Sequence, residues 1–121
     1  MADILIVDDS RGIRTEVQGF LSKQGYKVIT ANDGNEGIQK IQSHPELKLV
    51  ISDVNMPELD GISMVEKIRL EMENQQIQIL MFTTENHPAL KKRAKDLKVN
   101  GWLVKPFIGE KILPVVKKLI G

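Results

Sequence analysis

The sequence contains no cysteine. Disulfide bonds, thiolate metal sites and cysteine nucleophiles are therefore excluded. The sequence also lacks an excess of either charge, because 17 lysine and arginine residues nearly balance 16 aspartate and glutamate residues and leave a net charge of +1. This balance gives no general electrostatic reason to expect binding to nucleic acid or to a membrane.

The chain also lacks a long apolar run. The early run at residues 4–7 is far too short for a signal peptide or a membrane-spanning helix. The 121 residues are 41% hydrophobic and 27% charged, which is the composition of an ordinary globular domain. We therefore expect a single domain over residues 1–121, in a cytoplasmic protein that contacts neither membrane nor nucleic acid.

What is present is an alternation of strand and helix patterns, repeated five times along the chain. Short apolar runs bounded by turn residues are typical of buried strands in a parallel sheet. The expected strands are residues 4–7, 26–31, 49–51, 77–82 and 102–104. Five such units joined by short loops predict an α/β fold, in which a parallel sheet carries helices on both faces.

Capping residues mark the helix boundaries. The expected signals are Ser10, Asp33 with Glu36, Asp60 and Pro88 at the starts, and Gly25 at the first end. The last helix has an apolar stripe made of Ile108, Ile112, Val115, Val116 and Leu119. Pro114 within that helix removes one backbone hydrogen bond, so we expect a local kink or a late helix start.

Polar residues follow four of the expected strands. Asp8 and Asp9 follow the first strand, Asp53 the third, Thr83 the fourth and Lys105 the fifth. Because the carboxyl ends of parallel strands lie along one edge of the sheet, these side chains should converge. Three converging carboxylates repel one another unless a cation such as Mg²⁺ is present. A lysine and a hydroxyl suit phosphoryl oxygens, so the set predicts phosphoryl transfer to a carboxylate.

Each of these residues alone has an ordinary structural interpretation, as a turn, a cap or a surface lysine, and only their joint placement favours a site. Two other function classes share parts of this pattern. A flavin carrier would share the topology but needs a glycine- and hydroxyl-rich phosphate loop after the first strand. A phosphatase with an aspartyl-phosphate intermediate would carry D-x-D there and usually a cap domain. The sequence shows neither pattern.

The same residues carry a family resemblance. The pattern comprises Asp8-Asp9, Asp53 with Met56-Pro57 and Asp60-Gly61, Thr83, and Lys105-Pro106-Phe107. In this order and spacing it resembles the receiver domain of two-component response regulators over the whole chain. The resemblance implies a flavodoxin-like (βα)5 doubly wound parallel sheet with strand order 2-1-3-4-5. Because the chain ends after the last expected helix, it is most similar to stand-alone, CheY-like receivers of the chemotaxis type.

The resemblance implies a phosphorylated switch and not a general enzyme, since the chain would catalyse only its own phosphorylation and dephosphorylation. Asp53 would be the phosphoacceptor for a histidine kinase. Asp8, Asp9, Asp53 and the backbone carbonyl of Asn55 would bind Mg²⁺, with Mn²⁺ as a substitute.

Further residues receive roles from the same resemblance. Thr83 and Lys105 would hold the phosphoryl oxygens, and Lys105 would pair with Asp53 before phosphorylation. A cis bond would precede Pro106. Asn55 and Glu85 would tune the lifetime of the aspartyl phosphate.

The family also couples the threonine to an aromatic ring on the last strand, which here is Trp102 in place of the usual tyrosine or phenylalanine. Indole is larger, and its N–H needs a partner when buried. Trp102 either stays outward as a contact surface or swings inward with local repacking, and we favour the contact role.

The implied output surface consists of the fourth helix, the fifth strand and the last helix. The fourth helix carries the basic residues Lys91, Lys92, Arg93, Lys95 and Lys98. They form either a solvated face or a docking face for an acidic partner segment. The first candidate partner is a flagellar motor switch, and the alternative is a phosphorelay intermediate or phosphate sink. We expect a monomer.

Overall fold

The computed structural model describes all residues, 1–121, and its centre is a sheet of five parallel strands. The strands are β1 (Ile4–Val7), β2 (Val28–Ala31), β3 (Leu49–Ser52), β4 (Gln78–Thr83) and β5 (Gly101–Val104). Their order in the sheet is β2-β1-β3-β4-β5. The predicted flavodoxin-like topology is therefore confirmed, and β2 and β5 are the two edge strands.

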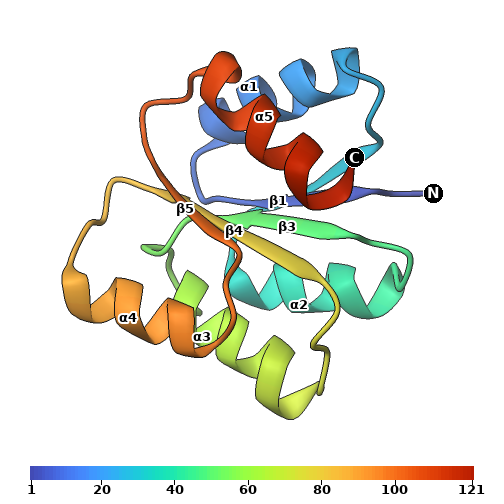
Figure 1. The fold of residues 1–121 in the computed structure, drawn as a ribbon. Coiled ribbons are helices and arrows are strands. Elements are labelled where there is room, and N and C mark those ends of the chain that lie inside the picture. Colours follow the sequence, from blue (N-terminus) through green and yellow to red (C-terminus); the bar gives the residue numbers. More distant parts are fainter.

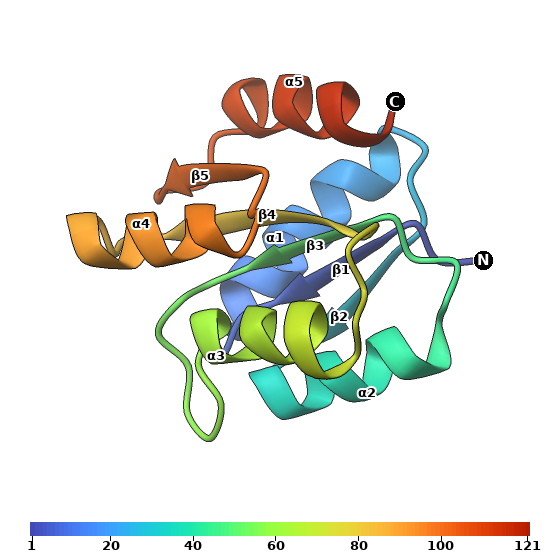
Figure 2. The ribbon, with the colours of Figure 1, turned by 60° about the horizontal axis from the view of Figure 1, so that its bottom comes forward.

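Helices cover both faces of the sheet. They are α1 (Arg11–Lys23), α2 (Gly34–Ser43), α3 (Gly61–Glu66), α4 (Pro88–Asp96) and α5 (Gly109–Ile120). Figure 1 shows α1 and α5 on one face and α2, α3 and α4 on the other, and Figure 2 shows the same layers from a second direction. Each face has its own buried apolar core. Burial on both faces explains why β1 and residues 49–51 of β3 are continuous apolar runs. None of the helices has the length and apolar character needed to cross a bilayer.

The predicted helix boundaries are confirmed by local hydrogen bonds. The side chains of Ser10, Asp33 and Asp60 each accept a backbone N–H from three residues further on. These bonds satisfy donors that the first turn of a helix leaves free. Pro88 is the first residue of α4, and Gly25 follows α1 with a φ of 98°, a conformation that favours glycine.

Other boundaries differ from the prediction. β2 begins at Val28 and not at residue 26, and β4 extends to Thr83. Ile108 does not belong to the inward stripe of α5, because it precedes the first helical turn and is 41% exposed. A late start at Pro114 is also wrong, since α5 begins at Gly109 and continues through the proline. The helix keeps its length because its buried face packs on the sheet, which offsets one missing hydrogen bond.

The segment after α3 is wider than an α-helix. It is a π-helix over Lys67–Glu71, a change of register that a 3.6-residue pattern does not predict. The segment places Arg69 in the interior, with 3% of its surface exposed. Its guanidinium donates hydrogen bonds to the backbone carbonyl oxygens of Asn74, Leu97 and Lys98. The end of α4 is thereby fixed to the end of this helical segment.

Candidate functional site

The carboxyl ends of the strands gather the predicted polar residues. Asp8 directly follows β1, Asp53 follows β3, Thr83 ends β4 and Lys105 follows β5. Because these four strands are neighbours in the parallel sheet, their last residues lie along one edge. The fold therefore joins at this edge side chains that are far apart in the sequence.

Three carboxylates form an acidic cluster made of Asp8, Asp9 and Asp53. One ligand oxygen from each lies within 4.8 Å of the others. Asp8 and Asp53 are 2% and 8% exposed, whereas Asp9 is exposed to solvent. Burial raises the pKa of Asp8, because the loss of water disfavours the charged form, although hydrogen bonds from Lys105 and the Ser10 N–H act in the opposite direction.

The ammonium of Lys105 connects two of these carboxylates. Its Nζ lies 2.9 Å from Oδ2 of Asp53, which is the expected pair, and 2.9 Å from Oδ2 of Asp8. Burial alone would lower the pKa of Lys105, but the hydrogen bonds and charges of Asp53 and Asp8 outweigh it and raise the pKa. The lysine thus acts as an internal cation for the cluster. The peptide bond between Lys105 and Pro106 is cis, as predicted.

The backbone near Asp53 is fixed by the loop that returns toward α3. Oδ1 of Asp53 accepts the N–H of Val54 at 2.7 Å, while Oδ2 contacts Lys105. Gly61 packs directly on the Asp53 backbone, where an added Cβ would overlap the carbonyl oxygen of Asp53. Only glycine allows this approach, which gives a physical reason for the glycine of the Asp60-Gly61 motif.

Glu85 connects three parts of the site. Its N–H donates to Oγ1 of Thr83 at 3.1 Å, and its carboxylate accepts a hydrogen bond from the Asn55 side chain at 3.3 Å. Its backbone carbonyl accepts the indole N–H of Trp102 at 3.1 Å. The β4–α4 loop is therefore tied to the β3–α3 loop and to β5. Because the Thr83 oxygen acts as an acceptor here, its hydroxyl proton stays available for donation.

Trp102 combines the two predicted orientations. The ring is half-buried and packs against the core, and its N–H has the partner that a buried indole needs. The ring also borders a shallow cavity of about 170 Å³ between α4 and β5. The Nζ of Lys91 lies 5.9 Å from the ring centroid, within the range of a cation–π contact. The residue therefore reaches both the β4–α4 loop and the surface.

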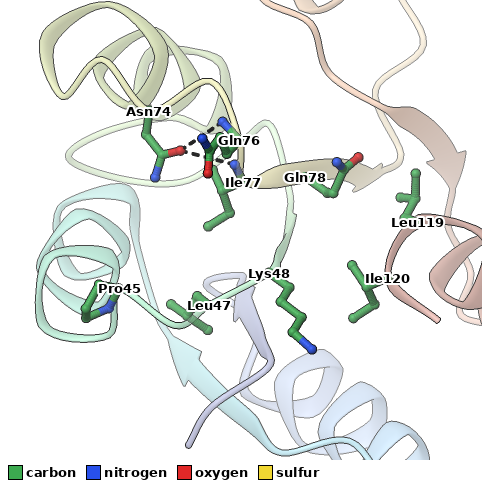
Figure 3. Close-up of a pocket in the computed structure, with 9 residues that line it drawn as sticks. All are labelled: Pro45, Leu47, Lys48, Asn74, Gln76, Ile77, Gln78, Leu119 and Ile120. Carbon is green, nitrogen blue, oxygen red and sulfur yellow. Dashed lines mark hydrogen bonds between the residues drawn. The ribbon is translucent and has the colours of Figure 1, made fainter.

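A larger cavity of about 440 Å³ lies at the opposite end of the sheet, near the amino ends of β3 and β4 (Figure 3). It is lined by Pro45, Leu47, Lys48, Asn74, Gln76, Ile77, Gln78, Leu119 and Ile120. Lys48 is the only charged residue in this lining. The side-chain oxygen of Asn74 already accepts the backbone N–H groups of Gln76 and Ile77. This cavity is larger than the one beside Trp102, but it offers no converging groups for chemistry.

Sequence reasoning missed the pair between Lys105 and Asp8 and the connecting role of Glu85. The strands before Lys105 and Asp8 are not neighbours in the sheet, so chain order gives no signal for their contact. Glu85 makes two of its three bonds through backbone atoms, which no side-chain pattern reveals. One feature of the sequence does indicate the Asn55–Glu85 bond: each of these residues stands two positions after a predicted site residue.

The donor set of the cluster fits a hard divalent cation. The three carboxylates offer oxygen ligands, and the backbone carbonyl of Asn55 accepts no hydrogen bond within the chain. Mg²⁺ takes oxygen ligands in octahedral geometry and keeps several waters, which suits a cluster with the exposed Asp9 on one side. A cation also lowers the cost of keeping Asp8 and Asp53 charged together.

Known proteins match this chain over nearly all of its length. Residues 4–117 match the response regulator receiver domain. Chemotaxis protein CheY1 of Helicobacter pylori is 34% identical over 119 residues, covering 98% of this chain and 96% of the relative. The structure of Vibrio cholerae CheY4 has a TM-score of 0.90 and 41% identity, covering 99% of each chain. That of Thermotoga maritima TrrA, in complex with Mg²⁺-BeF, has a TM-score of 0.87 and 30% identity over 99% of this chain and 100% of the other. The chain therefore belongs to the receiver domain family of two-component response regulators.

Proposed function

We propose that Asp53 accepts a phosphoryl group from a histidine kinase and that this modification switches the affinity of the chain for a partner protein. The observation that carries the proposal is the buried Asp53 carboxylate, which shares the Lys105 ammonium with Asp8 inside the acidic cluster. An oxygen of Asp53 would bond to phosphorus while the bond from phosphorus to the kinase imidazole nitrogen breaks. The nitrogen keeps the electron pair of the broken bond. The chain would catalyse only its own modification.

Asp8, Asp9, Asp53 and the backbone carbonyl of Asn55 would hold Mg²⁺, with Mn²⁺ as a substitute. The bound ion would supply positive charge for the phosphoryl oxygens. The cluster supports this role through its three carboxylate oxygens within 4.8 Å of one another. The structure of the relative TrrA, which is in complex with Mg²⁺-BeF, supports it independently.

Lys105 and Thr83 would hold the phosphoryl oxygens. The Lys105 ammonium lies 2.9 Å from the proposed acceptor, so its charge is already placed where the new group forms. Thr83 is fully buried, and its oxygen accepts the Glu85 N–H in a bond that does not use the hydroxyl proton. Charges and donors fixed in advance stabilise the transferring group without reorganisation of solvent.

The switch would act on a surface made of α4, β5 and α5. Trp102 joins this surface to the β4–α4 loop, and the exposed side chains of Val104 and Ile108 add apolar area to it. Lys91 and the other basic residues of α4 give it positive charge. Apolar anchors within a basic surface fit an acidic, partly apolar segment of a partner. The first candidate is a flagellar motor switch, in line with the chemotaxis relatives.

Asn55 and Glu85 would set the lifetime of the aspartyl phosphate, because their hydrogen bond joins the two loops beside Asp53. The chain would work in the cytoplasm as a monomer that passes a signal from kinase to partner.

Acetyl phosphate tests the proposal without knowledge of the kinase. With Mg²⁺, the wild-type chain should gain the mass of one phosphoryl group, and Asp53→Asn should gain none. Beryllofluoride should then change the fluorescence of Trp102 in the wild type and not in Asp53→Asn. Full labelling of Asp53→Asn, or no labelling of the wild type, would overturn the assignment.

A further inference from the structure

The three phenylalanine rings of the chain form one stack that ends at Lys105. Phe82 lies on β4, Phe20 lies on α1, and Phe107 stands between them after β5. The centroids of Phe20 and Phe107 are 5.5 Å apart with planes at 72°, and those of Phe82 and Phe107 are 6.3 Å apart at 82°. Both are edge-to-face contacts, an arrangement that aromatic pairs favour. The rings therefore fix one another across three elements.

The ring at the end of this stack faces the lysine. The Nζ of Lys105 lies over the ring of Phe82, 5.8 Å from its centroid. Phe82 is 4% exposed and the Lys105 side chain 14%, so little water screens the contact. A desolvated cation is attracted to the face of an aromatic ring. The ammonium thus has a third neighbour besides Asp8 and Asp53.

The register of the sheet explains this contact. Phe82 is paired with Leu103 on the neighbouring strand. Side chains alternate along a strand, so Lys105 leaves the chain on the same face as Leu103 and passes the ring of Phe82. A lysine has four rotatable bonds and many rotamers, and a ring along its path reduces that freedom.

At the other end of the stack, the ring of Phe20 is closely packed. Gly109, the first residue of α5, approaches Phe20 so closely that an added Cβ would overlap the ring. The first residue of α5 therefore packs directly against the ring of Phe20. This packing holds Phe20 against Phe107, and Phe107 in turn holds Phe82.

We propose that Phe82 is a positioning residue for phosphoryl transfer, whose ring holds the Lys105 ammonium between Asp8 and Asp53. In this role Phe82 would act on the acceptor carboxylate and on the phosphoryl group only through Lys105. The inference rests on the proposed function of Lys105. It extends that function by adding a contact that depends on an aromatic ring at position 82.

The test replaces the ring and keeps an apolar side chain. Phe82→Leu should be phosphorylated by acetyl phosphate, at saturating Mg²⁺, about threefold to fivefold more slowly than the wild type. In a Lys105→Ala background the same substitution should cause no further slowing, because the two residues act as one unit. An unchanged rate in the wild-type background, or equal slowing in both backgrounds, would overturn the proposal.

Phe107→Leu serves as the matched control, since it removes a ring of the same stack that does not face the lysine. Its rate should fall less than that of Phe82→Leu at temperatures where both variants are folded. Equal slowing would mean that general packing, and not the ring beside Lys105, sets the rate.

A second measurement needs no phosphorylation. Proton exchange between the Lys105 ammonium and water, followed by NMR of the Mg²⁺-free chain, should be several-fold faster in Phe82→Leu, and an unchanged exchange rate would refute the positioning role. If acetyl phosphate fails to label the wild type, the proposed function fails, while this exchange rate still tests the contact between Phe82 and Lys105.

Discussion

The indole nitrogen of Trp102 donates a hydrogen bond to the backbone carbonyl oxygen of Glu85 at 3.1 Å. The N–H of Glu85 in turn donates to the hydroxyl oxygen of Thr83. One loop residue thus contacts both the threonine beside the acidic cluster and the aromatic ring beside α4. We therefore expect a displacement of Thr83 to strain the bond from the Glu85 N–H, and the bond from the Trp102 indole to the Glu85 carbonyl would pass this strain to Trp102.

Trp102→Phe tests this connection, because it keeps an aromatic ring and removes the N–H donor. A hydrogen bond of this kind contributes about 1 kcal/mol, so the Glu85 amide should exchange with solvent roughly fivefold faster. Amide exchange followed by NMR gives the rate, and the amides of β2, far from the loop, serve as an internal control. Identical exchange at Glu85 in both proteins would show that the indole does not hold the loop.

Glu85→Ala should shorten the lifetime of the aspartyl phosphate, because it removes the side-chain bond to Asn55 that joins the two loops over Asp53. The bond is exposed and 3.3 Å long, so the expected acceleration of hydrolysis is only about twofold to fivefold. The loss of phosphoryl mass after removal of acetyl phosphate measures it. Glu85→Gln keeps a side-chain acceptor and should stay near the wild-type rate, whereas equal acceleration in both would assign the effect to charge.

The placement of the cluster could be predicted because it depends on features local in sequence. Asp8 directly follows an apolar run and Asp53 follows one after a single serine, and the parallel topology then fixes the edge at which they lie. Ile108 was predicted wrongly for a related reason, since a 3.6-residue pattern does not distinguish the first helical turn from the residue before it.

Features that depend on two elements at once could not be predicted. From the sequence alone, Gly37 is expected to lower the stability of the helix that contains it. In the structure, an added Cβ there would lie 2.8 Å from the sulfur of Met64, so the glycine allows α2 and α3 to pack closely. The interior position of Arg69 likewise depends on the π-helical register and on carbonyl groups that α4 supplies.

Arg69→Met should lower the free energy of unfolding by about 2–4 kcal/mol, because three carbonyl oxygens lose their donor, one in a buried and two in partly buried hydrogen bonds. No carboxylate pairs with this guanidinium, and burial lowers its pKa. Its stabilising effect therefore comes from the hydrogen bonds. Urea unfolding gives the value. Arg93→Met is the control, since Arg93 pairs with Glu66 at the surface, where such a pair contributes about 0–1 kcal/mol. Equal losses in the two variants would contradict the role of Arg69.

Asp8→Asn should stabilise the fold at neutral pH. Burial raises the pKa of Asp8, so the folded chain holds this proton more tightly than the unfolded chain. The resulting stabilisation is complete below the ordinary pKa of 3.8 and is lost as the pH rises through the folded value. At neutral pH the charged carboxylate therefore destabilises the folded chain. Its removal should add on the order of 1 kcal/mol to the free energy of unfolding. The gain should shrink as the pH falls toward 3.8.

Asp9→Asn is the matched control, because Asp9 belongs to the same cluster but is exposed. Its unfolding free energy should change by no more than about 0.5 kcal/mol, as for most surface substitutions. Both variants should bind Mg²⁺ more weakly than the wild type, so a gain in stability at Asp8 alone would separate the cost of burial from the loss of a ligand. That result would mean that the fold keeps a buried carboxylate for function at the expense of stability. Equal urea midpoints for wild type and Asp8→Asn at every pH would instead mean that Lys105 compensates the buried charge completely.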